Sequence, residues 1–172
     1  MLDLPFSNQE FAARLSKTRV EMAARGLDAI FVTDPSNMAW LTGYDGWSFY
    51  VHQGVLLSQD GEPIWWGRAM DAAGAQRTTY LNHENIAGYD DTYVQNPTKH
   101  PMEDLSKLIA ARGLAHGRIG FEMDNYYFTA SAFLSLQQNL KSVQFIDVTG
   151  LVNWQRAVKS PTEIDYMRRA AR

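Results

Sequence analysis

Residues able to do acid–base or metal chemistry are few and widely separated in this 172-residue chain. The four histidines stand at positions 52, 83, 100 and 116, with no pair at helical spacing and no His-Glu-x-x-His motif. Cysteine is absent, which excludes disulfides, thiolate–zinc sites and thiol nucleophiles. No glycine-flanked serine, phosphate-binding loop or dinucleotide fingerprint occurs. The sequence therefore predicts no catalytic residue and no metal ligand set within these residues.

Two groups of carboxylates are the strongest remaining candidates for such chemistry. Glu122 and Asp124 follow an apolar run, where carboxylates could exchange protons, although the neighbouring Asn125 favours a turn or capping role. The segment HENIAGYDD, residues 83–91, gathers a histidine, a glutamate and two aspartates. A hard-metal site is conceivable there. A solvated acidic loop is the favoured interpretation.

Aromatic side chains are concentrated in the segment NMAWLTGYDGWSFY, residues 37–50. It follows a predicted strand, and loops after the carboxyl ends of strands are where open α/β sheets bind ligands. An aromatic there can cover a substrate, contact a cation or anchor an interface. For Tyr44 and Trp47 this interpretation stands beside simple packing over the sheet. Packing is the expectation for the other aromatics, Trp40, Phe49 and Tyr50.

The elements that must position these residues alternate along the chain. Strands are predicted at 27–34, 50–58, 62–67, 85–89, 117–123 and 142–148, and helices at 7–25, 68–80, 101–112, 129–140 and 160–172. The first helix is expected to begin at Ser7 with a capping box to Glu10, between the apolar residues Phe6 and Phe11. Asp60-Gly61 predicts a hairpin turn. Together these predict an α/β domain with a mixed β-sheet flanked by helices.

Composition and charge narrow the class of protein. The chain is 45% hydrophobic and 20% charged, with a net charge of −3, as in ordinary globular domains. Its basic residues form no stripe, so nucleic acid is not an expected partner. No signal peptide pattern and no run of roughly 18 apolar residues occurs. A cytoplasmic location without membrane association is the expectation.

The last predicted helix, at 160–172, has a clear beginning and no stop signal. Ser160 is placed as N-cap with Glu163 as its capping-box partner, and Ile164, Met167 and Ala171 form an apolar stripe. The pattern alone allows two interpretations. The helix either continues into a further domain or is a natural C-terminal helix with a basic end.

Four stretches resemble one known family, in the right order along the chain. DPSNMAWLTGYDG (34–46) is similar to the N-x-x-Y-L-T-G-F/Y stretch of the creatinase/prolidase/aminopeptidase P family, with Trp40 in place of the usual tyrosine. The other three resemble its first helix and strand (14–37), its IGxE strand and following helix (118–136), and its R-x-x-K-S-x-x-E-I-x-x-M-R-x-A junction (152–171). The ectoine hydrolase branch is the most similar.

The resemblance implies a ribonuclease-H-like N-terminal domain over residues 1–155. Residues 156–172 would be a linker and the start of a C-terminal "pita-bread" catalytic domain that is otherwise absent. The parent enzyme would hydrolyse a C–N bond in ectoine, creatine or an Xaa-Pro peptide. Metal-binding members use a divalent dimetal centre, held by two Asp, one His and two Glu of the C-terminal domain, and creatinase-like members work without metal.

The resemblance also implies a role for the aromatic loop. The family's N-terminal domain commonly helps to form a homodimer and lends residues to the mouth of the partner's active site. The substrate-gating candidates are Tyr44, Asp45, Trp47 and His52. One alternative is a stand-alone small-molecule binding or interaction module. A ribonuclease-H-like nuclease would need clustered carboxylates, for which the sequence offers no convincing set.

Overall fold

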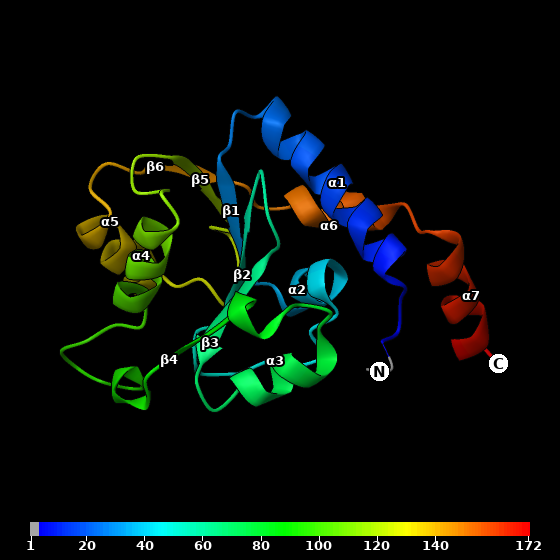
Figure 1. Cartoon of the computed structure of the whole chain (residues 1–172), viewed down its shortest axis with the longest axis horizontal. Helices are drawn as coiled ribbons and strands as arrows, with labels where there is room; N and C mark the ends of the chain where they lie inside the picture. Colours follow the sequence, from blue (N-terminus) through cyan, green and yellow to red (C-terminus); the bar gives the residue numbers. More distant parts are fainter. Residues whose placement is uncertain (1–3) are drawn as a thin grey trace.

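A six-stranded sheet forms the centre of the computed structural model, which describes residues 4–172 (Figure 1). The strands are β1 (Ala29–Val32), β2 (Gly54–Ser58), β3 (Ile64–Arg68), β4 (Ile86–Tyr89), β5 (Arg118–Phe121) and β6 (Gln144–Asp147). Their order is β4-β3-β2-β1-β5-β6, and only the pairs that involve β2 are antiparallel. This confirms the predicted mixed sheet and its hairpin.

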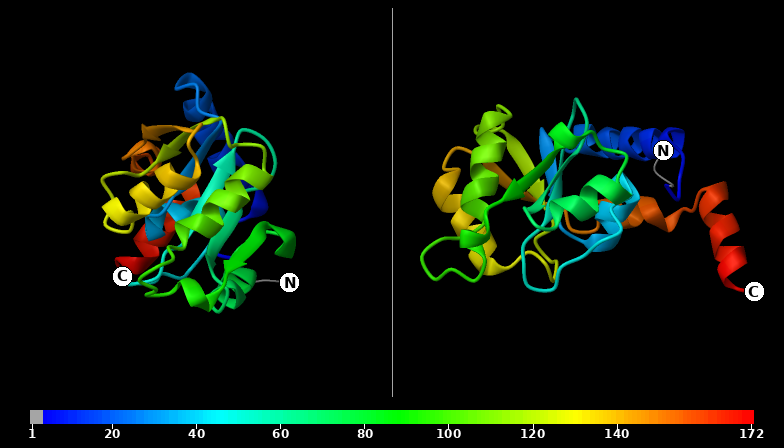
Figure 2. Two further views of the ribbon diagram at one scale, coloured as in Figure 1. Left: turned by 90° about the vertical axis from the view of Figure 1, so that its left-hand side faces the viewer. Right: turned by 60° about the horizontal axis from the view of Figure 1, so that its bottom comes forward.

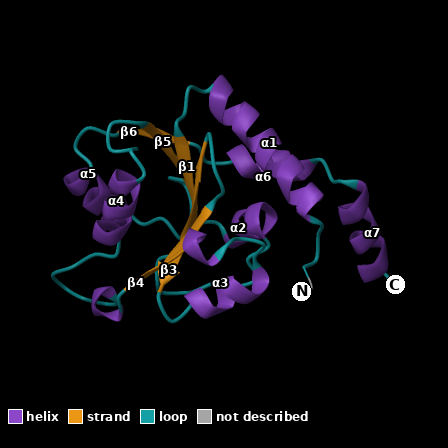
Figure 3. Ribbon diagram, in the orientation of Figure 1, coloured by secondary structure: helices purple, strands orange, loops and turns teal. Residues whose placement is uncertain are grey.

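Helices cover both faces of this sheet (Figures 1 and 3). One face carries α1 (Asn8–Ala24), α2 (Pro35–Thr42), α3 (Ala72–Thr78) and α6 (Leu151–Ala157), and the other carries α4 (Met102–Ala111) and α5 (Ala130–Asn139). Two short 3₁₀ helices, η1 (His83–Asn85) and η2 (Asp91–Tyr93), flank β4. The last helix, α7 (Pro161–Ala170), extends away from the sheet. No helix within residues 4–172 is long and apolar enough to cross a membrane.

Strand alternation divides the apolar residues between two cores. In β1, Ile30 and Val32 belong to the core beneath α1, α2 and α6, whereas Ala29 and Phe31 belong to the core beneath α4 and α5. Successive side chains of a strand point to opposite faces, so a strand covered on both faces is apolar throughout. Helices therefore cover β1 on both of its faces.

The start of α1 differs in one detail from its predicted capping box. The Ser7 hydroxyl accepts the backbone N–H of Glu10 at 3.2 Å, and the rings of Phe6 and Phe11 make edge contact at 6.1 Å. The Glu10 carboxylate instead accepts a hydrogen bond from Arg14 at 3.4 Å. The N-cap and the hydrophobic staple are confirmed. The reciprocal half of the box is replaced because a buried cation lies one turn along the helix.

The helix α6 was not predicted. It buries Leu151 and Val152 in the same core as α1 and α2. The predicted domain boundary after residue 155 therefore falls inside a helix that packs on this domain. The division into 1–155 and 156–172 stays a prediction.

One edge of the sheet collects most of the polar and aromatic loops. Five of the strands are parallel and end there, and the antiparallel β2 begins there, because Val32 at the end of β1 pairs with Val55. Loop 43–53, which leads into β2, therefore lies beside loop 122–129, which comes directly after β5. The right-hand view of Figure 2 shows both loops together along the lower side of the molecule.

Candidate functional site

Loop 43–53 starts from a sharply defined helix end. The Asp34 carboxylate caps α2 by accepting the backbone N–H of Asn37 at 2.9 Å. Gly43 ends α2 in a left-handed conformation, with φ of 83°. A Cβ at Gly43 would lie 2.9 Å from the carbonyl oxygen of Thr78, so both the conformation and the space require glycine. The loop therefore leaves α2 in a fixed direction.

An aromatic surface, defined as Trp47, Phe49, Tyr126 and Tyr127, joins this loop to loop 122–129. The Trp47 ring makes edge contacts with Phe49 at 6.2 Å and Tyr127 at 6.4 Å between centroids, and Tyr126 contacts Tyr127 at 5.8 Å. The exposed fractions are 60% for Trp47, 70% for Phe49 and 81% for Tyr126. The expectation that Phe49 and Tyr50 pack inside is wrong, since both are exposed.

Tyr44 lies beneath the loop and not on it. Its side chain is 4% exposed, its ring is 5.3 Å from that of Trp65, and its hydroxyl donates to Gln53 Oε1 at 3.0 Å. Burial raises the pKa of the Tyr44 phenol to about 12, so the hydroxyl keeps its proton at neutral pH. Of the two interpretations left open for Tyr44, packing is the one observed. The same holds for the expected burial of Trp40.

Asp45 and His52 take different positions. Asp45 is exposed, and its backbone N–H donates to the Thr78 hydroxyl at 3.2 Å. His52 is half-buried behind the aromatic surface, with its ring 4.9 Å from that of His100. Its carbonyl accepts the Tyr89 hydroxyl at 2.9 Å. Of the four gating candidates, the structure therefore exposes Asp45 and Trp47, encloses Tyr44, and places His52 in support of the loop.

Protonation of His52 is predicted to lower the free energy of unfolding as the pH falls. Burial first, and the nearby His100 second, lower the pKa of the His52 imidazole to about 4, although contact with the Tyr127 backbone opposes the shift. Because the folded pKa lies below the unfolded value, stability is lost as pH falls from about 6.5 toward 4. We expect His52 to cost about 2 kcal/mol between pH 7 and pH 5. Urea unfolding at pH 7 and pH 5 measures the loss of free energy of unfolding, which should be about 2 kcal/mol smaller in His52→Gln than in the wild type. An equal loss in both proteins would contradict the prediction.

A buried carboxylate organises the turn between β1 and α2. Glu122 Oε2 accepts the backbone N–H groups of Thr33 at 2.7 Å and Asp34 at 2.8 Å, and Oε1 accepts the Asn37 amide at 2.6 Å. Burial raises the pKa of the Glu122 carboxyl, and these donors oppose the shift. Asn125 closes the following turn by accepting the Tyr127 N–H at 2.9 Å. Glu122 thus has a turn-forming role, the interpretation that the neighbouring Asn125 had favoured over acid–base chemistry.

The same polar network reaches α6, a connection that local patterning missed. The Asn37 amide donates to Asn153 Oδ1 at 2.9 Å, and Arg156 Nη1 donates to Asn37 Oδ1 at 2.6 Å. Asn37 and Arg156 both lie in stretches that carried the family resemblance. The network ties the loop-bearing helix α2 to both β5 and α6.

The acidic segment 83–91 is occupied by local contacts. Asp91 accepts two hydrogen bonds from Arg68, at 2.7 and 3.0 Å, and Asp90 accepts the Thr92 N–H at 2.8 Å. These are the contacts of a solvated loop and its 3₁₀ turn. Across residues 4–172, no three or more His, Asp or Glu side chains are grouped so that they could hold a metal ion.

Comparison with known proteins gives a consistent family. A family model described as the Creatinase/Prolidase N-terminal domain matches residues 14–158. The chain is 56% identical to ectoine hydrolase of Halomonas elongata, over 99% of this chain and 43% of that protein. It is 26% identical to creatinase of a Bacillus species, over 97% of this chain and 38% of the relative. The chain thus spans less than half the length of these curated relatives.

Solved structures share the fold. An Xaa-Pro dipeptidase from Bacillus anthracis superposes with a TM-score of 0.70 at 18% identity, covering 90% of this chain and 38% of that one. The N-terminal domain of the cytoplasmic peptidase PepQ from Mycobacterium tuberculosis gives a TM-score of 0.60 at 19% identity, covering 83% of this chain and 97% of that one. At this identity the likeness shows the fold alone. It confirms the predicted fold class.

Proposed function

The chain belongs to the Creatinase/Prolidase N-terminal domain family, and on that premise we propose that it is the non-catalytic part of a hydrolase of C–N bonds. Its relatives are longer proteins of which it forms the N-terminal part, so a C-terminal domain is expected to come after it. The proposed role of residues 1–172 is to shape the mouth of an active site that the C-terminal domain supplies. A homodimer, in which this loop lies at the partner's active site, and a cytoplasmic location belong to the same proposal.

The observation that supports this role is the exposed aromatic surface. Three of its side chains are largely exposed, those of Trp47, Phe49 and Tyr126. The two loops that carry them each contain a buried residue, Tyr44 in one and Glu122 in the other. Exposed aromatics held on a rigid base are typical of binding surfaces, because aromatic rings add large contact area for little loss of side-chain freedom. Their place at the carboxyl edge of the sheet is where ligands of α/β folds bind.

The proposed substrate is a small molecule with a delocalised cation and a carboxylate, or a dipeptide. Ectoine and creatine both have the first character, and the name of the Halomonas relative favours ectoine. Aromatic faces attract such a cation by about 0.5–2 kcal/mol. Residues 4–172 bring together no metal ligand set, so the hydrolytic step, with a metal-activated water or without metal, is assigned to the C-terminal domain.

A direct assay tests the division of labour. The purified 172-residue chain is expected to hydrolyse none of ectoine, creatine and Gly-Pro, with or without added divalent metal, because the proposal assigns the hydrolytic step to the C-terminal domain. The whole protein at the same concentration is the matched control and should hydrolyse at least one of them. Turnover by the 172-residue chain itself, removed by a substitution within it, would sink the proposal.

A further inference from the structure

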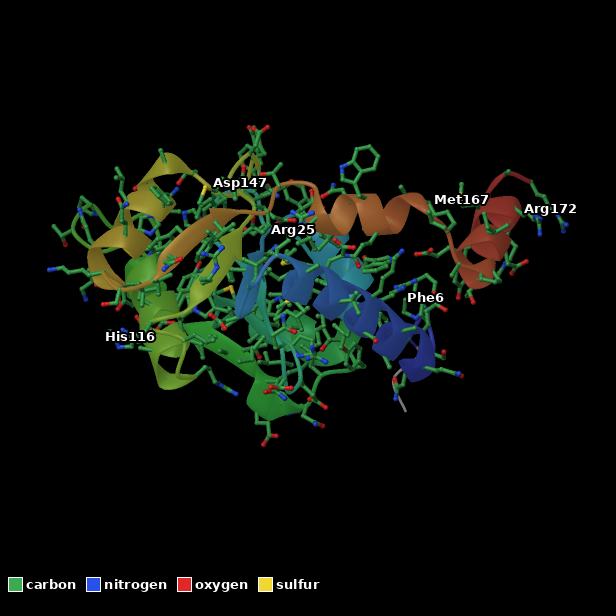
Figure 4. The ribbon with its side chains drawn as sticks, turned by 90° about the horizontal axis from the view of Figure 1, so that it is seen from above. Phe6, Arg25, His116, Asp147, Met167 and Arg172 are labelled. Carbon is green, nitrogen blue, oxygen red and sulfur yellow. The ribbon has the colours of Figure 1, made fainter. Side chains whose placement is uncertain are left out.

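The helix α7 is held to the domain by a polar joint, defined as Arg14, Trp40 and Glu163. No residue of α7 is buried. Figure 4 shows this helix, which contains Met167 and is followed by Arg172, near Phe6 at the start of α1 and beyond the rest of the molecule. Glu163 Oε1 accepts Arg14 Nη2 and the Trp40 indole N–H, each at 3.0 Å. The joint thus brings together α1, α2 and α7.

The joint is enclosed on the side of the domain. Arg14 is 4% exposed, its Nη1 donates to the Trp40 carbonyl at 3.0 Å, and the Phe6 ring centroid lies 3.9 Å from its Cζ. Burial lowers the pKa of the Arg14 guanidinium, and the carboxylates of Glu163 and Glu10 oppose that shift. A buried cation of this kind is destabilising when its carboxylate partner is removed. Glu163 is therefore the acceptor through which α7 is joined to Arg14 and Trp40.

The same carboxylate also starts the helix that it anchors. Glu163 Oε2 accepts the Ser160 N–H at 2.8 Å, and the Ser160 hydroxyl accepts the Glu163 N–H at 3.2 Å, which completes the predicted capping box. A second face of α7 is uncovered, since Met167 is 55% exposed. Glu163 thus takes part both in the initiation of α7 and in its attachment to the domain. Tyr166 makes a second attachment, since its hydroxyl donates to the Pro5 carbonyl at 2.5 Å and its ring makes edge contact with Phe6 at 5.4 Å.

The joint connects directly to the aromatic loop. Trp40 lies in α2, three residues before Gly43, where loop 43–53 begins. A shift of α7 relative to α2 would therefore change the position of Trp47 relative to any domain attached to the end of α7.

We propose that Glu163, with Arg14 and Trp40, is a positioning residue that fixes the direction in which the chain leaves this domain. It thereby holds the aromatic surface in register with the C-terminal domain. The presence of a catalytic domain beyond α7 rests on the proposed function, whereas the joint itself does not.

Amide hydrogen exchange tests the joint without reference to activity. Isolated helices of ten residues are marginal in water, so α7 should lose protection once it is released. In the 172-residue chain, Glu163→Ala should speed exchange over residues 164–170 by at least about tenfold, with β1 unchanged. Asp165→Ala, which removes an exposed carboxylate of the same helix, is the matched control. Equal exchange in the two variants would overturn the joint.

Kinetics of the whole protein test its consequence. Glu163→Ala should lower kcat/KM by about tenfold for the substrate that the wild type hydrolyses, with Glu163→Gln recovering part of the loss because its amide oxygen still accepts from Trp40. Asp165→Ala should match the wild type. If α7 is released and kcat/KM does not change, the positioning role is wrong. If the proposed function is wrong instead, Trp47→Ala should have the same kcat/KM as the wild type.

Discussion

Trp47→Ala in the whole protein is expected to lower kcat/KM by roughly ten- to thirtyfold, because under the proposed function it removes an aromatic face that contacts the substrate's cation at the mouth of the active site. The melting temperature of the 172-residue chain should stay nearly unchanged, since Trp47 is 60% exposed and substitutions at exposed positions usually alter stability by less than about 0.5 kcal/mol. Steady-state kinetics and thermal unfolding on the same preparations measure both quantities.

Two further variants make this result specific to Trp47. Trp47→Phe keeps an aromatic face and should recover most of the lost kcat/KM. Leu134→Ala removes an exposed apolar side chain from α5, on the other side of the sheet from α2, and should leave both quantities unchanged. A large fall in melting temperature for Trp47→Ala would assign the residue to packing, and an unchanged kcat/KM would remove the gating role.

Glu122→Ala is expected to destabilise the 172-residue chain by about 3–5 kcal/mol, the largest stability effect among these variants. The substitution removes the acceptor of the Thr33 and Asp34 N–H groups and one of the two acceptors of the Asn37 amide. Stability should be measured by urea unfolding at pH 7, with the midpoint and slope both fitted.

A neighbouring carboxylate gives the matched comparison. Asp124→Ala, two residues along the same loop with an exposed side chain, should change stability by less than about 0.5 kcal/mol. Glu122→Gln retains one acceptor oxygen and should lie between these two variants. A Glu122→Ala protein as stable as Asp124→Ala would show that the turn between β1 and α2 does not depend on this carboxylate.

The sheet and most helices could be predicted from local sequence because apolar periodicity reports burial directly. The four residues of β1 are all apolar because helices cover both faces of this strand. Gly61, with φ of 80°, adopts the conformation that the predicted hairpin turn needs. The helix α6 was not predicted because only three of its seven residues are buried, which is too few to show a helical period of apolar residues. These are Leu151, Val152 and Gln155.

The site was less predictable because its contacts span the chain. Glu122 bonds to Thr33 across 89 positions and Glu163 bonds to Arg14 across 149, and no local pattern can pair such residues. The presence of an aromatic residue in the sequence also does not tell whether its side chain is buried in the core or exposed on the surface. Tyr44 is enclosed and Phe49 is exposed, although both stand in one short segment.

Photo-crosslinking from position 47 tests most directly whether this loop faces the C-terminal domain. Benzoylphenylalanine would replace Trp47 in the whole protein, and mixing light and heavy isotope-labelled subunits would distinguish links within one chain from links between two. The account predicts crosslinks to residues beyond 172, between subunits if the proposed homodimer forms. Crosslinks confined to residues 1–172 would contradict it.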